Sequence, residues 1–422
     1  MSNVLDFLEK RGFVDQVTHQ ELKEALNNPV CLYHGIDPTA DCLHIGNLVG
    51  LVQLMHFARH GHRPVILVGG ATGLIGDPSG KDEERPLLTL EIVQSNVKKI
   101  KAIIERFLPS DDPNVAPIFV NNFDWYEKMN VIEYLRVVGK QFRVGPMMGK
   151  ESVRKRLNSD EGMSYTEFSY QLLQGYDFYH LFKKHNVVLQ IGGSDQYGNI
   201  TAGTEVVRRM GEGPVFGFTY PLLTRSDGKK FGKSESGAIW IDRDRLSPYE
   251  FYQYLVRTPD ADVPLFMRAL TLMDVEEINQ IEQSMSSSSY EVNSAQKRFA
   301  EEVTRLVHGE KGLQEALVTT AAVTPGKLSF DEENLGQVKD SMPNIELARG
   351  EVLGQSYIDV AVASGLLKSK GEARRLLQNG GAYINGEKVF SADTSIEISH
   401  VLKDELVVLS AGKKKSLLII LK

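Results

Sequence analysis

The chain has 422 residues, of which 42% are hydrophobic and 24% charged, and its formal net charge is −7. A chain of this length exceeds a single hydrophobic core, so we expect roughly two to four domains. No apolar run approaches the roughly 20 residues of a membrane helix. The two cysteines, Cys31 and Cys42, are too few for a disulfide framework or a Cys/His zinc site. The composition therefore predicts a cytoplasmic protein with no membrane partner and no protein-bound metal.

The first part of the chain alternates apolar runs with helical periodicity. Residues 31–35 and 63–69 are predicted as strands, and residues 43–59 between them as a helix. Strand, helix and strand in this order are typical of a βαβ unit. The pattern therefore predicts a parallel sheet near the start of the chain.

A further strand, over residues 187–192, ends at Gly193 and Ser194. Open α/β sheets bind ligands at the carboxyl ends of their strands, so these two residues are candidates for a site. Residues 91–186 are predicted as a mostly helical insertion that contains a dimer interface. We therefore predict an α/β fold with a Rossmann-like catalytic domain over residues 1–240, and a homodimer.

The second part of the chain is predicted as helical and then mixed. Ser247 and Pro248 suit the cap and first turn of a helix, and helical periodicity continues from there, which predicts an α-helical domain over residues 241–323. Residues 324–350 contain proline, glycine and scattered acids and are predicted as a linker. Residues 351–422 are predicted as a small C-terminal α+β module.

The C-terminal module has its own signals. Residues 357–364 and 370–378 read as two short helices, and residues 382–389 as a hairpin with a turn at Asn385-Gly386. From residue 353 onward there are ten Lys and Arg against seven Asp and Glu, a net charge of +3, which leaves −10 for the preceding residues. This end of the chain is therefore the predicted RNA-facing part.

Three polar side chains share one face of an otherwise apolar predicted helix. Tyr170, Gln174 and Asp177 are spaced i, i+4 and i+7 among phenylalanines and leucines. Polar groups in such a helix must be paired, either with a ligand or with each other. The spacing alone leaves a ligand-binding helix and an internally bonded core helix as open alternatives.

Two further clusters lie about 185 residues apart. His44-Ile45-Gly46-Asn47 is a turn whose glycine lets the backbone approach a nucleotide, and Lys230-Phe231-Gly232-Lys233-Ser234 lies in a glycine-rich loop, over 225–237, whose lysines can neutralise a leaving pyrophosphate. The spacing of the glycines does not match a P-loop. A solvated surface loop is the alternative for the lysines.

These clusters and two more segments resemble one family. The motifs are Tyr33-x-Gly35-x-Asp37-Pro38-Thr39-Ala40-Asp41-x-Leu43-His44-Ile45-Gly46, the segment 170–178, the segment 190–196 and the Lys230 loop. In this order they resemble the bacterial tyrosyl-tRNA synthetases, a class I family, over nearly the whole chain. The resemblance implies that tyrosine and ATP react to tyrosyl-adenylate and pyrophosphate, that tyrosine is then transferred to the terminal adenosine of its tRNA, and that Mg²⁺ is bound through the phosphates.

The resemblance also implies roles for single residues. The tyrosine-binding residues it implies are Tyr170, Gln174 and Asp77 at the ammonium group, Asp177 and Tyr33 at the phenolic hydroxyl, and Gln196 close to the adenylate. The catalytic residues it implies around the phosphates are Thr39, His44, Lys81, Arg85, Lys230 and Lys233. The ATP-binding residues it implies are Gly35, Asp37, Gly46, Asn47, Gly193, Asp195 and again Lys233.

Two positions depart from the family pattern. Asn47 stands where the motif normally has its second histidine, and because an asparagine carries no charge we assign it a binding role only. His34, between Tyr33 and Gly35, is left off the predicted site.

The C-terminal module resembles an RNA-binding fold that is also found in a ribosomal protein of the small subunit. The cations at the start of its second helix, Lys368, Lys370, Arg374 and Arg375, are the predicted tRNA-binding residues. A solvated helix face is the alternative. The domain over 241–323 is expected to reach the anticodon.

Two other functions remain as alternatives. A tryptophanyl-tRNA synthetase shares the fold, but the pair Tyr33 and Asp177 indicates recognition of a hydroxyl that tryptophan lacks. A noncatalytic RNA-binding or splicing protein could be derived from a synthetase and keep its fold. The presence of His44, Lys230 and Lys233 indicates instead that catalysis is kept.

Overall fold

The computed structural model describes residues 3–79, 84–211, 213–228, 231–234, 237–323, 332–412 and 415–422, with the backbone alone for 233–234 and 332–335. The chain forms two compact units. Unit 1 comprises Met1–Ile239 and Ala261–Tyr290, and unit 2 comprises Trp240–Asp260 and Glu291–Lys422. Within the described chain, no helix combines the length and the apolarity needed to cross a membrane.

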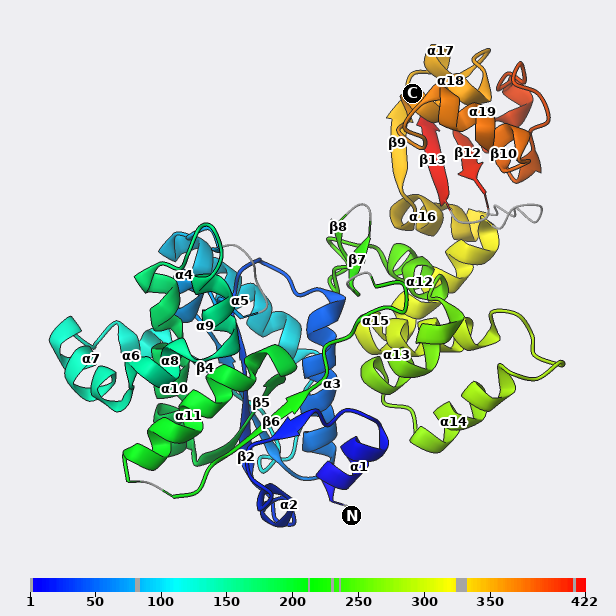
Figure 1. The fold of residues 1–422 in the computed structure, drawn as a ribbon. Coiled ribbons are helices and arrows are strands. Elements are labelled where there is room, and N and C mark those ends of the chain that lie inside the picture. Colours follow the sequence, from blue (N-terminus) through cyan, green and yellow to red (C-terminus); the bar gives the residue numbers. More distant parts are fainter. Residues whose placement is uncertain are drawn as a thin grey trace. The chain divides into compact units, whose positions relative to one another are not determined.

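A six-stranded sheet lies at the centre of unit 1 (Figure 1). Its order is β1-β6-β5-β2-β3-β4, and neighbouring strands are parallel except for β1, which is antiparallel to β6. The strands are β1 (Gln16–Val17), β2 (Cys31–Ile36), β3 (Arg63–Val68), β4 (Ile118–Asn121), β5 (Val187–Gly193) and β6 (Phe216–Tyr220). The predicted parallel α/β sheet is confirmed. Its strand order reverses between β2 and β5, and ligands of open α/β sheets bind at such a point.

Helices cover both faces of this sheet. Side chains alternate along β2, so Tyr33 and His34 point to opposite faces. The Tyr33 ring contacts Phe178 of α10, whereas the His34 ring lies against Gly50 of α3. Figure 1 accordingly shows α3 on one side of the sheet and α10 and α11 on the other. The covering helices are α3 (Ile45–Arg59), α4 (Thr72–Ile75), α5 (Leu90–Glu105), α10 (Tyr165–His185) and α11 (Tyr197–Arg209).

The local sequence explains where α10 begins and ends. The Ser164 hydroxyl caps the helix by accepting a hydrogen bond from the Glu167 backbone N–H. At the other end Asn186 adopts a left-handed conformation with φ of 53°, after three basic residues in the last turn. The helix that carries the polar stripe is therefore set by its own sequence.

The predicted helical insertion contains one strand that we did not predict. Strand β4 extends the sheet by pairing with β3. It is only four residues long and half-buried, so it has too few alternating positions to be recognised from the sequence. The helices that follow it are α6 (Phe123–Tyr126), α7 (Val131–Val137), η1 (Gly139–Gln141), α8 (Val144–Met148) and α9 (Glu151–Leu157).

The stretch that we predicted as one helical domain, residues 241–323, is divided between the two units. Arg11, which follows α1 (Val4–Lys10), gives a physical reason. Its buried guanidinium donates hydrogen bonds to the backbone carbonyls of Arg268 (3.0 Å), Thr271 (2.8 Å) and Met273 (2.5 Å). These contacts hold α13 and α14 in unit 1, because removing them would leave polar groups buried without partners. The helices concerned are α13 (Val263–Leu270) and α14 (Val275–Ser284) in unit 1, and α12 (Pro248–Val256) and α15 (Ser294–Ala322) in unit 2.

Unit 2 contains a five-stranded sheet of order β11-β10-β12-β13-β9. The predicted hairpin is confirmed, since Asn385 and Gly386 both have positive φ (47° and 79°) between β10 and β11. The predicted helix cap is confirmed too, because Ser247 accepts from the backbone N–H of Glu250 at the start of α12. The elements of the C-terminal part are β9 (Asn344–Leu347), α17 (Arg349–Val352), α18 (Tyr357–Ala363), α19 (Lys370–Gln378), β10 (Ala382–Ile384), β11 (Glu387–Lys388), β12 (Leu406–Ala411) and β13 (Lys415–Leu421).

The stretch predicted as a linker, residues 324–350, contains regular structure in its described part. Helix α16 (Glu332–Ser341) and strand β9 lie there, and β9 pairs in parallel with β13 at the end of the chain. A four-residue edge strand is stabilised by its distant partner rather than by its own pattern, so it could not be predicted from local sequence. Residues 324–331 lie outside the described residues.

Candidate active site

A buried carboxylate, Asp77, collects several donors beyond α4. Its two oxygens accept hydrogen bonds from the Gln196 amide (2.7 Å), the Ser79 backbone N–H (3.0 Å) and the Asn199 amide (3.3 Å). The Gln174 amide nitrogen in turn donates to Gln196 Oε1 at 3.3 Å. Three of the predicted tyrosine-binding residues, Asp77, Gln174 and Gln196, are therefore joined in one chain of hydrogen bonds.

A second carboxylate, Asp37, lies just after β2. Its Oδ2 accepts from the Tyr170 hydroxyl (2.8 Å) and its Oδ1 from the Thr72 hydroxyl (2.7 Å). Burial raises the pKa of Asp37 to about 6, and the nearby charge of Asp77 acts in the same direction. Asp37, predicted to bind ATP close to the amino acid or the adenylate, is thus bonded to Tyr170, one of the predicted tyrosine-binding residues.

The third carboxylate, Asp177, belongs to the polar stripe of α10. Its Oδ2 accepts from the Asn122 amide (3.0 Å) and its Oδ1 from the Trp125 indole N–H (3.1 Å). Burial raises its pKa to about 7, although these donors oppose the rise. Burial and the charge of Asp177 also hold the pKa of Tyr33 well above its usual value, so this tyrosine is a neutral hydroxyl near the carboxylate.

One amide connects the second and third carboxylates. Asn122 donates to Asp177 and also, at 3.0 Å, to the Thr72 hydroxyl, which donates to Asp37. Its own Oδ1 accepts from the backbone N–H of Ala71 at 2.7 Å. The side-chain donors in this chain of hydrogen bonds, Asn122 and Thr72, therefore point toward the two carboxylates and help to fix their orientation.

Thr72, Asn122 and Trp125 were not among the predicted site residues. A signal existed, since Asn121 and Asn122 are two polar residues directly after the apolar run of β4. It could not be used because β4 itself was not predicted.

Several buried polar atoms have no hydrogen-bond partner among the described residues. They include the Tyr33 hydroxyl, Gln174 Oε1 and Gln190 Oε1. Gln190 lies beside Tyr33 in the register of β5 and β2. Buried polar atoms are nearly always paired, so these atoms are available for hydrogen bonds to a polar ligand. The stripe on α10 bonds to other segments, not within itself, which favours the ligand-binding alternative over the internally bonded helix.

The predicted phosphate turn lies at the N-terminus of α3. The Gly46 N–H donates to His44 Nδ1 (3.1 Å), and the His44 N–H donates to Asn47 Oδ1 (3.0 Å). Asn47 thus caps the helix through its oxygen, a role that needs no charge. A side chain on Gly46 would come within 2.8 Å of the His44 ring, so only glycine fits here. The N-terminus of a 15-residue helix favours bound anions.

The two distant clusters of the sequence come together at this turn. The Ile45 N–H donates to the carbonyl of Ile239 (2.8 Å), and the Ile239 N–H donates to the carbonyl of Gly232 (3.0 Å). Gly232 has a φ of 82°, and a side chain there would approach Ile45 to 3.0 Å. Of the predicted cations, Lys81 and Lys230 lie outside the described residues, and Lys233 is described only by its backbone in β7 (Lys233–Ser234), which pairs with β8 (Gly237–Ala238).

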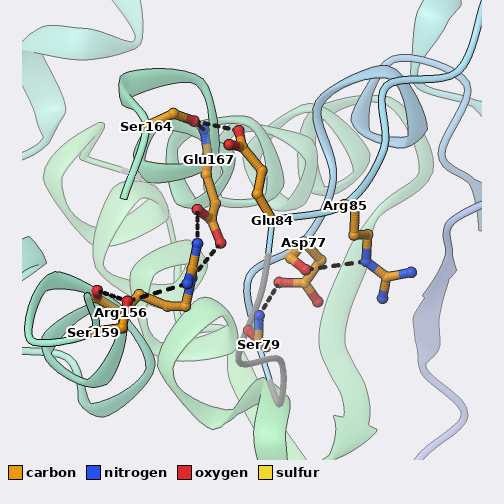
Figure 2. A network of polar contacts seen from close by, with 8 residues as sticks. All are labelled: Asp77, Ser79, Glu84, Arg85, Arg156, Ser159, Ser164 and Glu167. Atoms are coloured by element: carbon orange, nitrogen blue, oxygen red, sulfur yellow. Dashed lines mark hydrogen bonds and ion pairs between the residues drawn. The ribbon is translucent and has the colours of Figure 1, made fainter. Parts of the chain in front are cut away.

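Arg85 is the predicted phosphate cation whose side chain is described. Its Nε donates to the backbone carbonyl of Asp77 at 3.2 Å (Figure 2). Gly76, with a φ of 90°, lies against the Arg85 side chain. Arg85 is therefore bonded to the backbone of Asp77, a contact that could not be predicted from the sequence.

The remaining predicted ATP residues surround the carboxyl ends of β2 and β5. Gly193 ends β5, and a side chain on it would come within 2.7 Å of Asp195 Oδ1. Gly35 and Thr39 are exposed. His34 bonds through Nε2 to the Tyr220 hydroxyl at 2.9 Å, and burial lowers its pKa to about 4. A neutral, bonded His34 supports its omission from the site.

The predicted tRNA-binding cations belong to unit 2, in and next to α19. Lys368, Lys370, Arg374 and Arg375 are all exposed. Lys370 forms an ion pair with Asp359 at 2.6 Å. The four side chains thus lie on the surface of the C-terminal module.

Comparisons with known proteins agree with this fold. The family model described as tRNA synthetases class I (W and Y) matches residues 24–323. A second model, the tyrosine--tRNA ligase SYY-like C-terminal domain, matches residues 334–419. The first match, together with the parallel sheet and the motif at the start of α3, defines a class I tRNA synthetase.

Individual relatives narrow the class. The chain is 50% identical over 420 residues to a tyrosine--tRNA ligase of Protochlamydia amoebophila, covering 99% of each chain. It is 48% identical over 425 residues to that of Escherichia coli, again covering 99% of each. A C-terminally truncated mitochondrial tyrosyl-tRNA synthetase of Aspergillus nidulans superposes with a TM-score of 0.65 at 31% identity, over 75% of this chain and 92% of that one. The chain belongs to the tyrosine--tRNA ligase family.

The raised pKa of Asp177 predicts a pH dependence of stability. Between its ordinary pKa of 3.8 and the folded value of about 7, the folded state holds a proton that the unfolded state has lost. This carboxyl group therefore lowers the free energy of unfolding as the pH rises through that window. Asp177→Asn removes the group, so we expect the variant to gain stability relative to wild type from about pH 5 to about pH 7 and no further above it. Urea unfolding of both proteins across this range measures the difference, and a difference independent of pH would contradict the assignment.

Proposed function

We propose that the protein activates L-tyrosine with ATP to tyrosyl-adenylate and pyrophosphate, and then transfers tyrosine to the 3′-terminal adenosine of its tRNA in the cytoplasm. Relatives named tyrosine--tRNA ligase, 48% and 50% identical over nearly their full length, support this reaction. The observation on which the proposal mainly rests is the buried Asp177, held by Asn122 and Trp125 near the Tyr33 hydroxyl.

The phenolic hydroxyl of tyrosine would bind between Asp177 and Tyr33. An ionised Asp177 accepts a hydrogen bond from the phenol, and the Tyr33 hydroxyl, which has no described partner, can donate one back. A site built in this way rejects an analogue without the hydroxyl, because its buried polar groups would then be left unpaired. This argues against tryptophan as the substrate.

The ammonium group would bind among Asp77, Tyr170 and Gln174. Asp77 supplies negative charge, and the unpaired Oε1 of Gln174 supplies an acceptor. The Tyr170 hydroxyl donates its proton to Asp37, so its lone pairs remain for an N–H donor. Asp37 and Gln196 would hold these groups in place.

Adenylation needs no nucleophile from the protein. An oxygen of the tyrosine carboxylate attacks the α-phosphorus of ATP, and the bond to the bridging oxygen of pyrophosphate breaks. Catalysis then consists of positioning and of stabilising charge on the phosphates. The N-terminus of α3, with Thr39, His44 and Asn47, would favour the phosphates through the positive end of its helix dipole.

The cations for the leaving pyrophosphate would be Lys81, Arg85, Lys230 and Lys233. Arg85 uses Nε for the Asp77 carbonyl, which leaves its outer nitrogens for a phosphate. The positive φ of Gly228 (76°) and Gly232 (82°) gives the lysine loop turns that other residues adopt with difficulty. Gly35, Gly46, Gly193 and Asp195 would face the ribose and base of ATP.

Magnesium would enter as part of the ATP substrate. In the described part of the chain, no group of three or more His, Cys, Asp or Glu side chains could hold a metal ion. The phosphate oxygens of ATP are hard ligands of the kind that Mg²⁺ prefers, and their neutralisation would assist the leaving group.

Asp177→Ala tests the tyrosine pocket. We expect kcat/KM for tyrosine to fall about 10- to 100-fold in pyrophosphate exchange, the size of a lost hydrogen bond to a charged group, while KM for ATP changes by less than about twofold. The exchange is run without tRNA, with tyrosine, phenylalanine and tryptophan in turn. Asp124→Ala, an exposed acid in α6, is the matched control.

Equal losses for tyrosine and ATP would remove Asp177 from the phenol pocket. Exchange by the wild type with tryptophan would change the substrate but keep the mechanism. No exchange with any amino acid would leave the noncatalytic RNA-binding alternative.

The C-terminal module would bind the tRNA, and the helices around α12 and α15 would reach its anticodon. The match to a tyrosine--tRNA ligase C-terminal domain supports the first point. The exposed Arg374 and Arg375 on α19 are the cations best suited to phosphate contacts, since Lys370 is engaged by Asp359.

Reversing both charges, Arg374→Glu with Arg375→Glu, should weaken aminoacylation through KM for tRNA by about tenfold or more, because each lost phosphate contact weakens binding. Pyrophosphate exchange without tRNA should stay at the wild-type level. Lys422→Glu reverses an exposed charge elsewhere in the module and serves as the control. Unchanged charging of tRNA by the double variant would show that this face of α19 is not used.

A homodimer would form through the insertion of unit 1. Helices α7 and α8 expose large apolar side chains, which is unusual for a surface left in water. These are Val131, Ile132, Leu135, Val137, Val144 and Met148.

Ile132→Asp, at a side chain 61% exposed, should convert the dimer to a monomer at micromolar concentration, because an unpaired charge would be buried in the interface. Light scattering coupled to size exclusion measures the mass. Val292→Asp, at a site 74% exposed in unit 2, should leave the mass unchanged. A wild-type monomer would refute the proposal directly.

A further inference from the structure

A network beside the tyrosine pocket joins three segments of unit 1 (Figure 2). Arg156 of α9 and Glu167 of α10 form an ion pair with two hydrogen bonds, from Nε to Oε1 and from Nη2 to Oε2, both 3.0 Å long. Their side chains are only 2% and 3% exposed. Hydrogen bonding to Glu167 raises the pKa of Arg156, and Glu161 and Glu84 act in the same direction. This pair fixes α9 against the first turn of α10, because separating it would bury a lone charge.

The Ser164 hydroxyl extends this network to a segment 80 residues earlier. It accepts from the Glu167 N–H (3.1 Å) as the cap of α10, and it donates its proton to Glu84 Oε1 (2.5 Å). One hydroxyl can do both. Glu84 precedes Arg85, which bonds to the Asp77 carbonyl at 3.2 Å. Figure 2 shows Ser164 and Glu84 meeting on one side of the network and Arg85 reaching Asp77 on the other.

Two chains of hydrogen bonds connect the two sides of the proposed tyrosine pocket. Asp77 forms one side, and α10 carries the other with Tyr170 and Gln174. The direct chain between them runs through the Gln196 amide, and its Gln174 step is 3.3 Å long, outside the usual range for a strong bond. The other chain, from Tyr170 through Asp37 to Thr72, has short bonds of 2.8 and 2.7 Å, but it reaches this segment before Asp77. The hydrogen bond between Ser164 and Glu84 connects α10 to the same segment after Asp77.

We propose that Glu84 and Ser164 are positioning residues of tyrosine activation: their hydrogen bond fixes the segment that carries Asp77 and Arg85 to the start of α10. The proposal rests on the tyrosine-binding role of Asp77, Tyr170 and Gln174 proposed above. Neither residue touches the substrate. Their effect is to keep the ammonium site at the spacing in which the carboxylate of tyrosine can reach ATP.

The test exchanges the partners of this one hydrogen bond. Ser164→Asp keeps the helix cap, since an aspartate caps as well as a serine, but it sets a carboxylate against Glu84. Glu84→Gln alone keeps an acceptor for Ser164. In the double variant, the new amide can donate to the new carboxylate. Ser159→Asp introduces the same change at a serine that bonds Arg156 in the same network (3.3 Å) and is the matched control.

We expect Ser164→Asp to raise KM for tyrosine and to lower kcat/KM about tenfold in pyrophosphate exchange, the size of one lost hydrogen bond to a charged group. Glu84→Gln and Ser159→Asp should stay within about twofold of wild type, and the double variant should recover to within about threefold. Enzyme concentrations come from active-site titration, so that a loss of folded enzyme is not counted as a loss of kcat. KM does not depend on enzyme concentration, so a variant that is only less stable would keep the wild-type KM.

Three results would overturn the inference: wild-type kinetics in Ser164→Asp, no recovery in the double variant, or a loss that vanishes after titration. A wild-type enzyme without tyrosine-dependent exchange would instead refute the proposed function itself.

Discussion

Three carboxylates near the carboxyl ends of the parallel strands, the buried Asp77 and Asp177 and the partly buried Asp37, are the constraint on which the rest of unit 1 depends. Ionised groups removed from water must be paired with donors, or they become neutral. The raised pKa values of Asp37 and Asp177, about 6 and about 7, reflect this cost. Their donors come from β3–α4, from the end of β4 and from α10, so the sheet order and the placement of the helices are fixed around them. The donors are Thr72, Tyr170, Asn122 and Trp125.

The same constraint separates the charges that a substrate meets. The carboxylates gather on the Tyr33 face of β2, next to α10. The N-terminus of α3 lies on the opposite face at the end of β2. The Gly232 segment lies beside this helix terminus. In the proposed function, an amino acid with a free ammonium group would be stabilised near the carboxylates, and phosphates near the helix terminus. Reaction between the two then requires little more than correct positioning.

Positioning in turn depends on residues away from the substrate. Asn122 holds Asp177 and, through Thr72, Asp37. Arg85 holds the Asp77 backbone, and the pair Arg156 and Glu167 holds the first turn of α10. These contacts restrict the conformations of side chains that would otherwise be too mobile to define the site. The specificity of the pocket is thus distributed over segments far apart in the chain.

The elements with strong local patterns could be predicted from the amino-acid sequence. The βαβ unit, the capped helix at Ser247, the Asn385-Gly386 hairpin and the polar stripe on α10 follow from periodicity, capping residues and turn chemistry, which act over a few neighbours. The motifs also indicated which side chains gather at the sheet edge.

Other features depend on contacts between distant segments, which no local sequence pattern expresses. Strands β4 and β9 are four residues long and exist because β3 and β13 pair with them. Asn122 and Trp125 become functional only where β4 ends beside α10, and Ser164 meets Glu84 only after the chain has folded over 80 residues, since such contacts depend on partners that are distant in sequence and near in space.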